Sequence, residues 1–118
     1  TKAEVLTSLA GKDTVEEVYR SAAAGDARSR EAIETVADWL AIGLANTIAT
    51  LGPDRIVIGG GIVAAGEAVL EPIRRHLRER VTLVPPDEIQ VVAAQLGPKA
   101  GAVGAALAPL AAQAVRAR

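Results

Sequence analysis

The 118-residue sequence predicts an α/β fold with about two parallel strands and flanking helices. The run from Ile56 to Ile58 consists of β-branched residues, which is typical of a strand buried on both faces. Three glycines, Gly59–Gly61, end this run, and an apolar segment suited to a helix follows. A second short apolar run spans Ile89 to Val92. Strand, helix and strand in this order predict a parallel pair with a right-handed crossover.

The composition limits the class of protein. Half of the residues are hydrophobic but only 2% are aromatic, so we expect a core of Ala, Val, Leu and Ile. A net charge of −1 gives no general attraction to nucleic acid or to anionic membranes. The absence of cysteine excludes disulfides and thiolate metal sites and fits a cytoplasmic protein. The uncharged run from Ala100 to Val115 is shorter than the roughly 20 residues of a membrane span, so we expect no membrane role.

The chain before the first strand is predicted to be helical. Residues 1–25 are interpreted as an N-terminal helical segment, with a short helix over Lys2–Ala10. Thr14 and Glu17 have the spacing of a capping box, which predicts a second helix ending near Gly25. Residues 26–118 then form a single α-β-α-β-α unit.

The longest predicted helix runs from Ala27 to Leu51, with Asp26 as its N-cap. Its second half, Ala41–Leu51, carries no charge, so we expect it to lie against the sheet or a partner. Gly43 disfavours a helix by about 1 kcal/mol relative to Ala, which predicts close packing at that position.

The segment after the three glycines predicts a helix from Ile62 to Arg80 that is broken near Pro72. His76, the single histidine, is expected on the surface, since no cysteine or second histidine accompanies it. The helix also carries four arginines that are expected to form a solvated face, with an anion site as the alternative: Arg74, Arg75, Arg78 and Arg80.

A last helix is predicted to begin at Gly97, with proline in its first turn. Its small residues Gly101, Gly104 and Ala105 predict a buried face in close contact with the sheet, or with a ligand. Pro109 is expected to bend or end this helix.

The glycine loop is the candidate binding site. Gly60 or Gly61 is expected to adopt a positive φ or to lie against another backbone or a ligand. A loop at the carboxyl end of a parallel strand is a favoured ligand position, and backbone amides before a helix suit nucleotide phosphates. A tight turn without a ligand remains the alternative. No Ser-His-Asp set, paired loop carboxylates or metal-ligand spacing is present, so no catalytic or metal residue is predicted.

A family resemblance rests on several short motifs in a fixed order. These are Gly43–Asn46, Leu51–Gly61, Gly66, Pro72-Ile73, Leu96-Gly97, Ala100-Gly101 and Gly104–Ala106. Together they resemble the C-terminal part of the ROK family, which comprises bacterial sugar kinases such as glucokinases and sugar-responsive transcriptional repressors.

The resemblance implies an actin-like ATPase fold, which has two lobes that are each based on a ribonuclease-H-like sheet. This sequence corresponds to the end of the second lobe. In kinases of the family the loop matching Gly59, Gly60 and Gly61 lies next to the adenosine of ATP, and the helix after Gly97 packs nearby. These four glycines are therefore the implied nucleotide-contacting residues, with ATP as cofactor if the full-length protein is a kinase. The chain alone requires none.

The family's phosphate loop, catalytic aspartate and zinc motif are expected upstream of this sequence. The chain alone is therefore expected neither to phosphorylate a sugar nor to bind an operator, and it would meet sugar and DNA only through upstream regions. We interpret it as the C-terminal portion of a sugar-responsive transcriptional regulator. The alternatives are the same portion of an ATP-dependent sugar kinase and a non-catalytic oligomerisation module.

Self-association is also predicted. In the family fold one neighbour of the Ile56–Ile58 strand comes from strands upstream of this sequence. The strand would then present an unpaired edge beside an apolar face, and exposed edges of this kind recruit other chains. We therefore expect a homo-oligomer.

Overall fold

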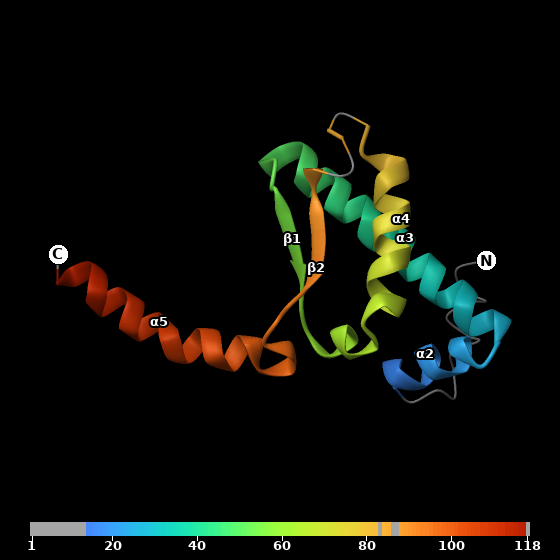
Figure 1. The fold of residues 1–118 in the computed structure, drawn as a ribbon, viewed down its shortest axis with the longest axis horizontal. Coiled ribbons are helices and arrows are strands. Elements are labelled where there is room, and N and C mark those ends of the chain that lie inside the picture. Colours follow the sequence, from blue (N-terminus) through green and yellow to red (C-terminus); the bar gives the residue numbers. More distant parts are fainter. Residues whose placement is uncertain (1–13, 83, 86–87, 118) are drawn as a thin grey trace.

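The computed structural model describes residues 14–82, 84–85 and 88–117, so the predicted helix over Lys2–Ala10 lies outside the described part. The described residues form helices and two short strands, with two helices before the first strand (Figure 1). In order they are α2 (Val15–Ala23), α3 (Ala27–Leu51), β1 (Arg55–Ile58), the 3-10 turn η1 (Gly61–Ala65), α4 (Glu67–Arg80), β2 (Gln90–Ala93), the 3-10 turn η3 (Gly97–Lys99) and α5 (Ala100–Arg116).

Strands β1 and β2 form a parallel two-stranded sheet, as predicted. Ile56 pairs with Val91, and Val57 with Val92. The Ala94 amide donates to the Ile58 carbonyl at 2.8 Å, which extends the pairing past the end of β2. The two chain segments that follow the strands therefore start side by side.

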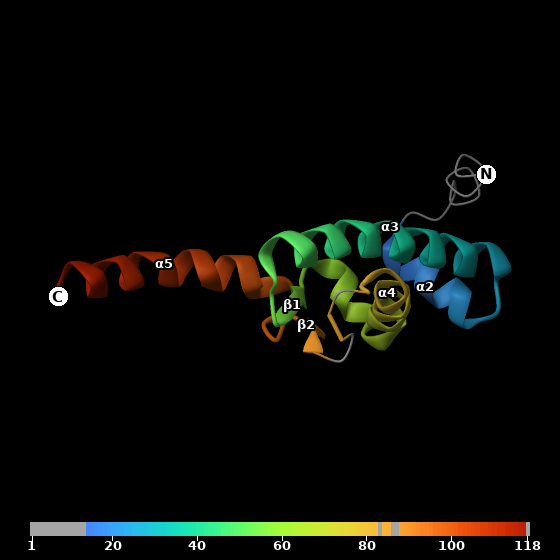
Figure 2. The ribbon, with the colours of Figure 1, turned by 90° about the horizontal axis from the view of Figure 1, so that it is seen from above.

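The hydrophobic core lies between α3, α4 and one face of this sheet. Figure 2 shows the helices on one side of β1 and β2. Ile56 and Ile58 pack against the buried cluster, which confirms a core of aliphatic side chains. The cluster consists of Ala37, Ala41, Ile48, Val69, Leu70, Ile73, Leu77, Val81 and Val91.

An arginine side chain bonds to the outer edge of β2. Residues Gln90 and Ala94 bond towards β1, so Val91 directs its backbone groups to the other side. Arg74 on α4 donates to the Val91 carbonyl from Nε at 2.9 Å and from Nη2 at 2.7 Å. A buried strand carbonyl is thereby satisfied by a side chain.

The sheet face opposite the helices is open. Val57 is 57% exposed, so the expectation that its strand is buried on both faces was wrong. The alternation of exposed and partly buried residues along β1 is that of a half-buried strand. The physical reason is that α5 extends away from the sheet (Figure 1).

The predicted boundaries of the first described helices are confirmed. Thr14 is the N-cap of α2, and its hydroxyl accepts a hydrogen bond from the Glu17 amide at 3.3 Å. Gly25 follows α2 with a φ of 103°, and α3 spans the predicted range, ending at a left-handed Gly52.

The break in the next helix lies elsewhere than predicted. The chain turns at Gly66, which has a φ of 58°, and α4 then runs from Glu67 through Pro72 without interruption. Proline forfeits one hydrogen bond, but the burial of Pro72 and its neighbour Ile73 in the core holds this segment helical.

The predicted burial of the last helix was wrong. Gly101 and Gly104 are exposed, and a Cβ added at either would meet no atom within 4 Å. Ala105 is also exposed, and Pro109 lies inside α5 rather than at its end. Small residues permit close packing but do not supply a neighbour, and no described element covers this helix. No described helix is both long and apolar enough for a membrane span.

The uncharged half of α3 is buried along one stripe only. Ala41 and Ile48 belong to the core, whereas Gly43 is exposed and a Cβ there would meet no atom within 4 Å. The close packing predicted at Gly43 is therefore not found among the described residues.

Candidate functional site

The glycines predicted to form the site lie together at one end of the sheet. Gly59–Gly61 follow β1 and lead into η1, and Gly97 begins η3 after β2. Because the strands are parallel neighbours, both loops start at the carboxyl end of the sheet, and η1 contacts η3. The fold thus brings four residues from two distant parts of the sequence into one site.

The backbone of this site depends on glycine. Gly60 has a φ of 91°, which confirms the predicted positive value, and Gly97 has a φ of 55°. L-residues rarely adopt this region. A Cβ at Gly60, Gly61 or Gly97 would meet no atom within 4 Å. Gly60 and Gly97 are therefore required by conformation, and all three glycines leave the loop surface open, whereas Gly59 lies beside Ala94.

A hollow of about 590 Å³ adjoins the loop after β2 and extends over the open face of the sheet. Val57, Val92 and Leu96 contribute apolar walls. Arg55 donates from Nη2 to the Gln90 side-chain oxygen at 2.8 Å and forms a polar side of the hollow. Sequence inspection missed this arrangement because Arg55 and Gln90 become neighbours only through the strand register.

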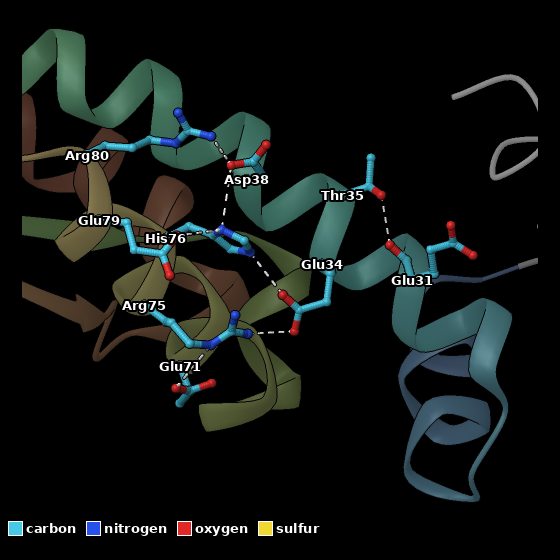
Figure 3. Close-up of polar contacts among 9 residues, drawn as sticks. All are labelled: Glu31, Glu34, Thr35, Asp38, Glu71, Arg75, His76, Glu79 and Arg80. Atoms are coloured by element: carbon cyan, nitrogen blue, oxygen red, sulfur yellow. Dashed lines mark hydrogen bonds and ion pairs between the residues drawn. The ribbon is translucent and has the colours of Figure 1, made fainter. Parts of the chain in front are cut away.

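A charged network joins α3 to α4 away from the glycine loop (Figure 3). His76 contacts Glu34 through Nε2 at 2.9 Å and Asp38 through Nδ1 at 3.5 Å. Arg75 donates to Glu34 at 2.6 Å, and Arg80 pairs with Asp38. The histidine side chain is 18% exposed, so it is more buried than the expected surface position implies, and it lies between two carboxylates.

The arginines of α4 are also occupied. Arg74 pairs with Glu67, in addition to its bonds to β2, and Arg75 and Arg80 pair with carboxylates of α3. Arg78 and Arg80 are exposed, and Arg74 and Arg75 are partly buried, so the predicted solvated face is confirmed in part, although three of its four arginines also pair with carboxylates. Arginines that are already neutralised offer little to an external anion. The network links α3 to α4. Its only local signal in the sequence was the spacing of the carboxylates at positions 34 and 38, which lie one helical turn apart.

Acidic pH should weaken this charged network between α3 and α4. The hydrogen bond from Arg75, supported by His76, lowers the pKa of Glu34 below its ordinary value of 4.5 despite partial desolvation. A lowered pKa adds stability above pH 4.5, and this is lost as the pH falls through the folded-state pKa. We expect the free energy of unfolding of Glu34→Gln, measured with urea from pH 7 to pH 3, to fall less steeply in acid than that of the parent.

The matched control for this experiment is Glu31→Gln, since the Glu31 carboxylate points away from the network (Figure 3). It should keep the parent's acid dependence. Parallel pH profiles for the parent and Glu34→Gln would contradict the assignment of the stabilising charge to Glu34.

Metal-ligating side chains are not clustered near the loop in the part of the chain that the structure describes. Among residues 14–82, 84–85 and 88–117 no group of three or more His, Cys, Asp or Glu side chains is placed to hold a metal ion. What the site offers is an open, glycine-shaped backbone at the carboxyl ends of two parallel strands. Such a surface can bind a ligand.

The parallel pair, the crossover helix and the long preceding helix are the C-terminal part of a lobe of the actin-like ATPase fold. A sequence profile of the ROK family matches residues 6–113. The chain therefore belongs to the ROK family, as its motifs indicated.

Three similar proteins illustrate the range of this family. A glucokinase from Streptomyces coelicolor is 36% identical over 110 residues, which is 89% of this chain and 35% of that protein. The crystal structure of a ROK family glucokinase from Streptomyces griseus, in complex with glucose and AMPPNP, matches with a TM-score of 0.70 and 36% identity. The match covers 76% of this chain and 29% of that one. A candidate xylose repressor from Caldicellulosiruptor is 31% identical over 98 residues, 79% of this chain and 25% of that protein.

The chain spans about a third of the length of the curated glucokinases that it matches.

Proposed function

We propose that this chain is the C-terminal portion of an ATP-dependent sugar kinase, and that it contributes the surface against which the nucleotide binds. Relatives named as glucokinases support the kinase over the transcriptional regulator first favoured from the sequence. The similar glucokinase structure contains AMPPNP, a nucleotide analogue, which supports ATP as the phosphate donor.

The observation that carries the proposal is the pair of glycine turns at the sheet edge. Gly60 and Gly97 have positive φ angles, which glycine adopts more readily than other residues, and the two turns contact each other. With no Cβ at Gly60, Gly61 or Gly97, a flat base and ribose can approach the main chain closely. In this proposal the chain positions adenosine, while phosphoryl transfer depends on groups elsewhere in the protein.

Gly60→Val, made in the protein that carries this chain, should weaken ATP binding at least tenfold. Valine strains a φ of 91° by about 1–3 kcal/mol, so the loop must rearrange. Calorimetry would measure ATP and glucose affinities separately, with glucose binding expected to persist. Gly104→Val is the matched control, since Gly104 lies on exposed α5 without a positive φ. Unchanged ATP affinity in Gly60→Val would contradict the proposal.

A sugar-responsive repressor is the second candidate, favoured by the similarity to the candidate xylose repressor. The two functions differ in what the whole protein does. ATP-dependent phosphorylation of glucose supports the kinase. Operator binding that is released by a sugar, without ATP turnover, supports the repressor.

A further inference from the structure

A second pocket lies between α4 and the outer edge of β2, on the side of β2 that faces away from β1 (Figure 1). Its lining residues come from the segments 74–81 and 89–92, and we call it the β2-edge pocket. None of the glycines of the candidate site is among them. Its volume is about 310 Å³, which lies at the small end of the range for ligand pockets in proteins.

The inner wall of the β2-edge pocket is apolar. Leu77, Val81 and Val91 line it, and all three side chains belong to the buried core. Ile89 adds a partly buried aliphatic side chain. Water gains few hydrogen bonds against such a wall, so an apolar group that replaces it is favoured.

The rim of the same pocket is cationic. Arg74 and Arg78 both line it and stand four positions apart on α4, where like charges repel. No acidic residue is among the lining residues. Arg78 is exposed, and no carboxylate of the described residues pairs with it. An anion between the two guanidinium groups would therefore relieve a repulsion that the described part of the chain leaves in place.

Arg74 is held in position at this rim. Its Nε and Nη2 donate to the Val91 carbonyl, and its Nη1 donates to Glu67 at 2.6 Å. A guanidinium has five N–H groups, so these three bonds leave two for a further acceptor. Because the group is already fixed, binding an acceptor costs little additional side-chain entropy.

The same bonds decide between two kinds of occupant. An extended peptide that added to the edge of β2 would pair with the free backbone groups of the strand, including the Val91 carbonyl. Arg74 already occupies that carbonyl through two donors. A small molecule can fill the pocket without displacing them, and the volume of the pocket suits a ligand of this size.

We propose that the β2-edge pocket binds a small organic carboxylate with an apolar tail. The carboxylate accepts hydrogen bonds from Arg78 and from the remaining N–H groups of Arg74, whose planar forks match its two oxygens. The tail lies against Leu77, Val81 and Val91. Since Glu67 balances the charge of Arg74, the rim has about one uncompensated positive charge, which favours a monoanion over a phosphate dianion.

Hexanoate is a probe with both of these features. Sodium hexanoate would be titrated into the ¹⁵N-labelled chain at constant ionic strength, and the backbone amide signals followed by NMR. The signals of residues 77–81 and 89–92 should shift and saturate. Arg78→Gln should weaken hexanoate binding by roughly tenfold or more, because a charge-assisted hydrogen bond is lost. Its circular dichroism spectrum should match that of the parent, since Arg78 is exposed.

The matched control is Arg28→Gln, the same substitution at an exposed arginine on α3, which should leave hexanoate binding unchanged. Three further probes separate the two parts of the pocket. Acetate lacks the tail, hexanol lacks the charge and inorganic phosphate is a dianion, so each should bind more weakly than hexanoate.

Four results would overturn the proposal. They are the absence of saturable shifts with hexanoate, an equal loss of binding in Arg28→Gln and Arg78→Gln, hexanol binding as tight as that of hexanoate, and acetate or phosphate binding as tight as that of hexanoate. The third result would describe a purely apolar pocket, and the fourth would describe an anion site that makes no use of the apolar wall.

Discussion

Ile73→Ala should lower the free energy of unfolding by about 2–5 kcal/mol, which is a large part of the stability of a typical domain. Ile73 is 1% exposed and lies on α4 at the centre of the only buried cluster among the described residues. The cluster consists of aliphatic side chains that interlock between two helices and a two-stranded sheet. With so few layers, little neighbouring structure can move in to fill the cavity.

Urea denaturation monitored by circular dichroism would measure this loss. Ile42→Ala provides the matched control, because Ile42 is 42% exposed on α3 and the substitution is the same. We expect the control to lose much less stability than the core variant. Similar losses in the two variants would show that the core is not organised around α4 as described.

Local signals in the sequence were sufficient for most helix ends and for the strand pair. The capping residues Thr14 and Glu17, the glycine at 25 and the turn at Gly52 act within one or two helical turns. The order of strand, helix and strand indicated the parallel pairing because a helix between two strands returns the chain to the end of the sheet where the first strand began. In each case the determinants lie close together in the chain.

Features that depend on distant neighbours were not predictable from the sequence. The β-branched run at β1 suits a strand buried on both faces, and the small residues of α5 suit a tightly packed helix. In the structure Val57 and Gly104 are both exposed, since no described element covers them. A residue pattern specifies which surfaces can be buried, but a neighbour must be present to bury them.

The candidate site was predicted in part for the same reason. The positive φ at Gly60 follows from a local turn, and the proximity of Gly97 follows from parallel pairing. The charged network around His76 joins residues more than 40 positions apart, so only the packing of α3 on α4 brings it together. Contacts between residues so far apart produce no periodic pattern in the sequence from which they could be predicted.

The contact between α3 and α4 makes a second strong prediction. Ala41 is fully buried on α3, and its small side chain lets the two helices approach closely. Ala41→Leu adds three carbon atoms to a filled space and should destabilise the fold by about 1–3 kcal/mol or more. In the same urea assay Ala49→Leu, an exposed position on the same helix, should stay within about 0.5 kcal/mol of the parent. Equal stability of Ala41→Leu and Ala49→Leu would contradict the close packing of α3 on α4. Only a void beside Ala41 could accept the larger leucine side chain without a loss of stability.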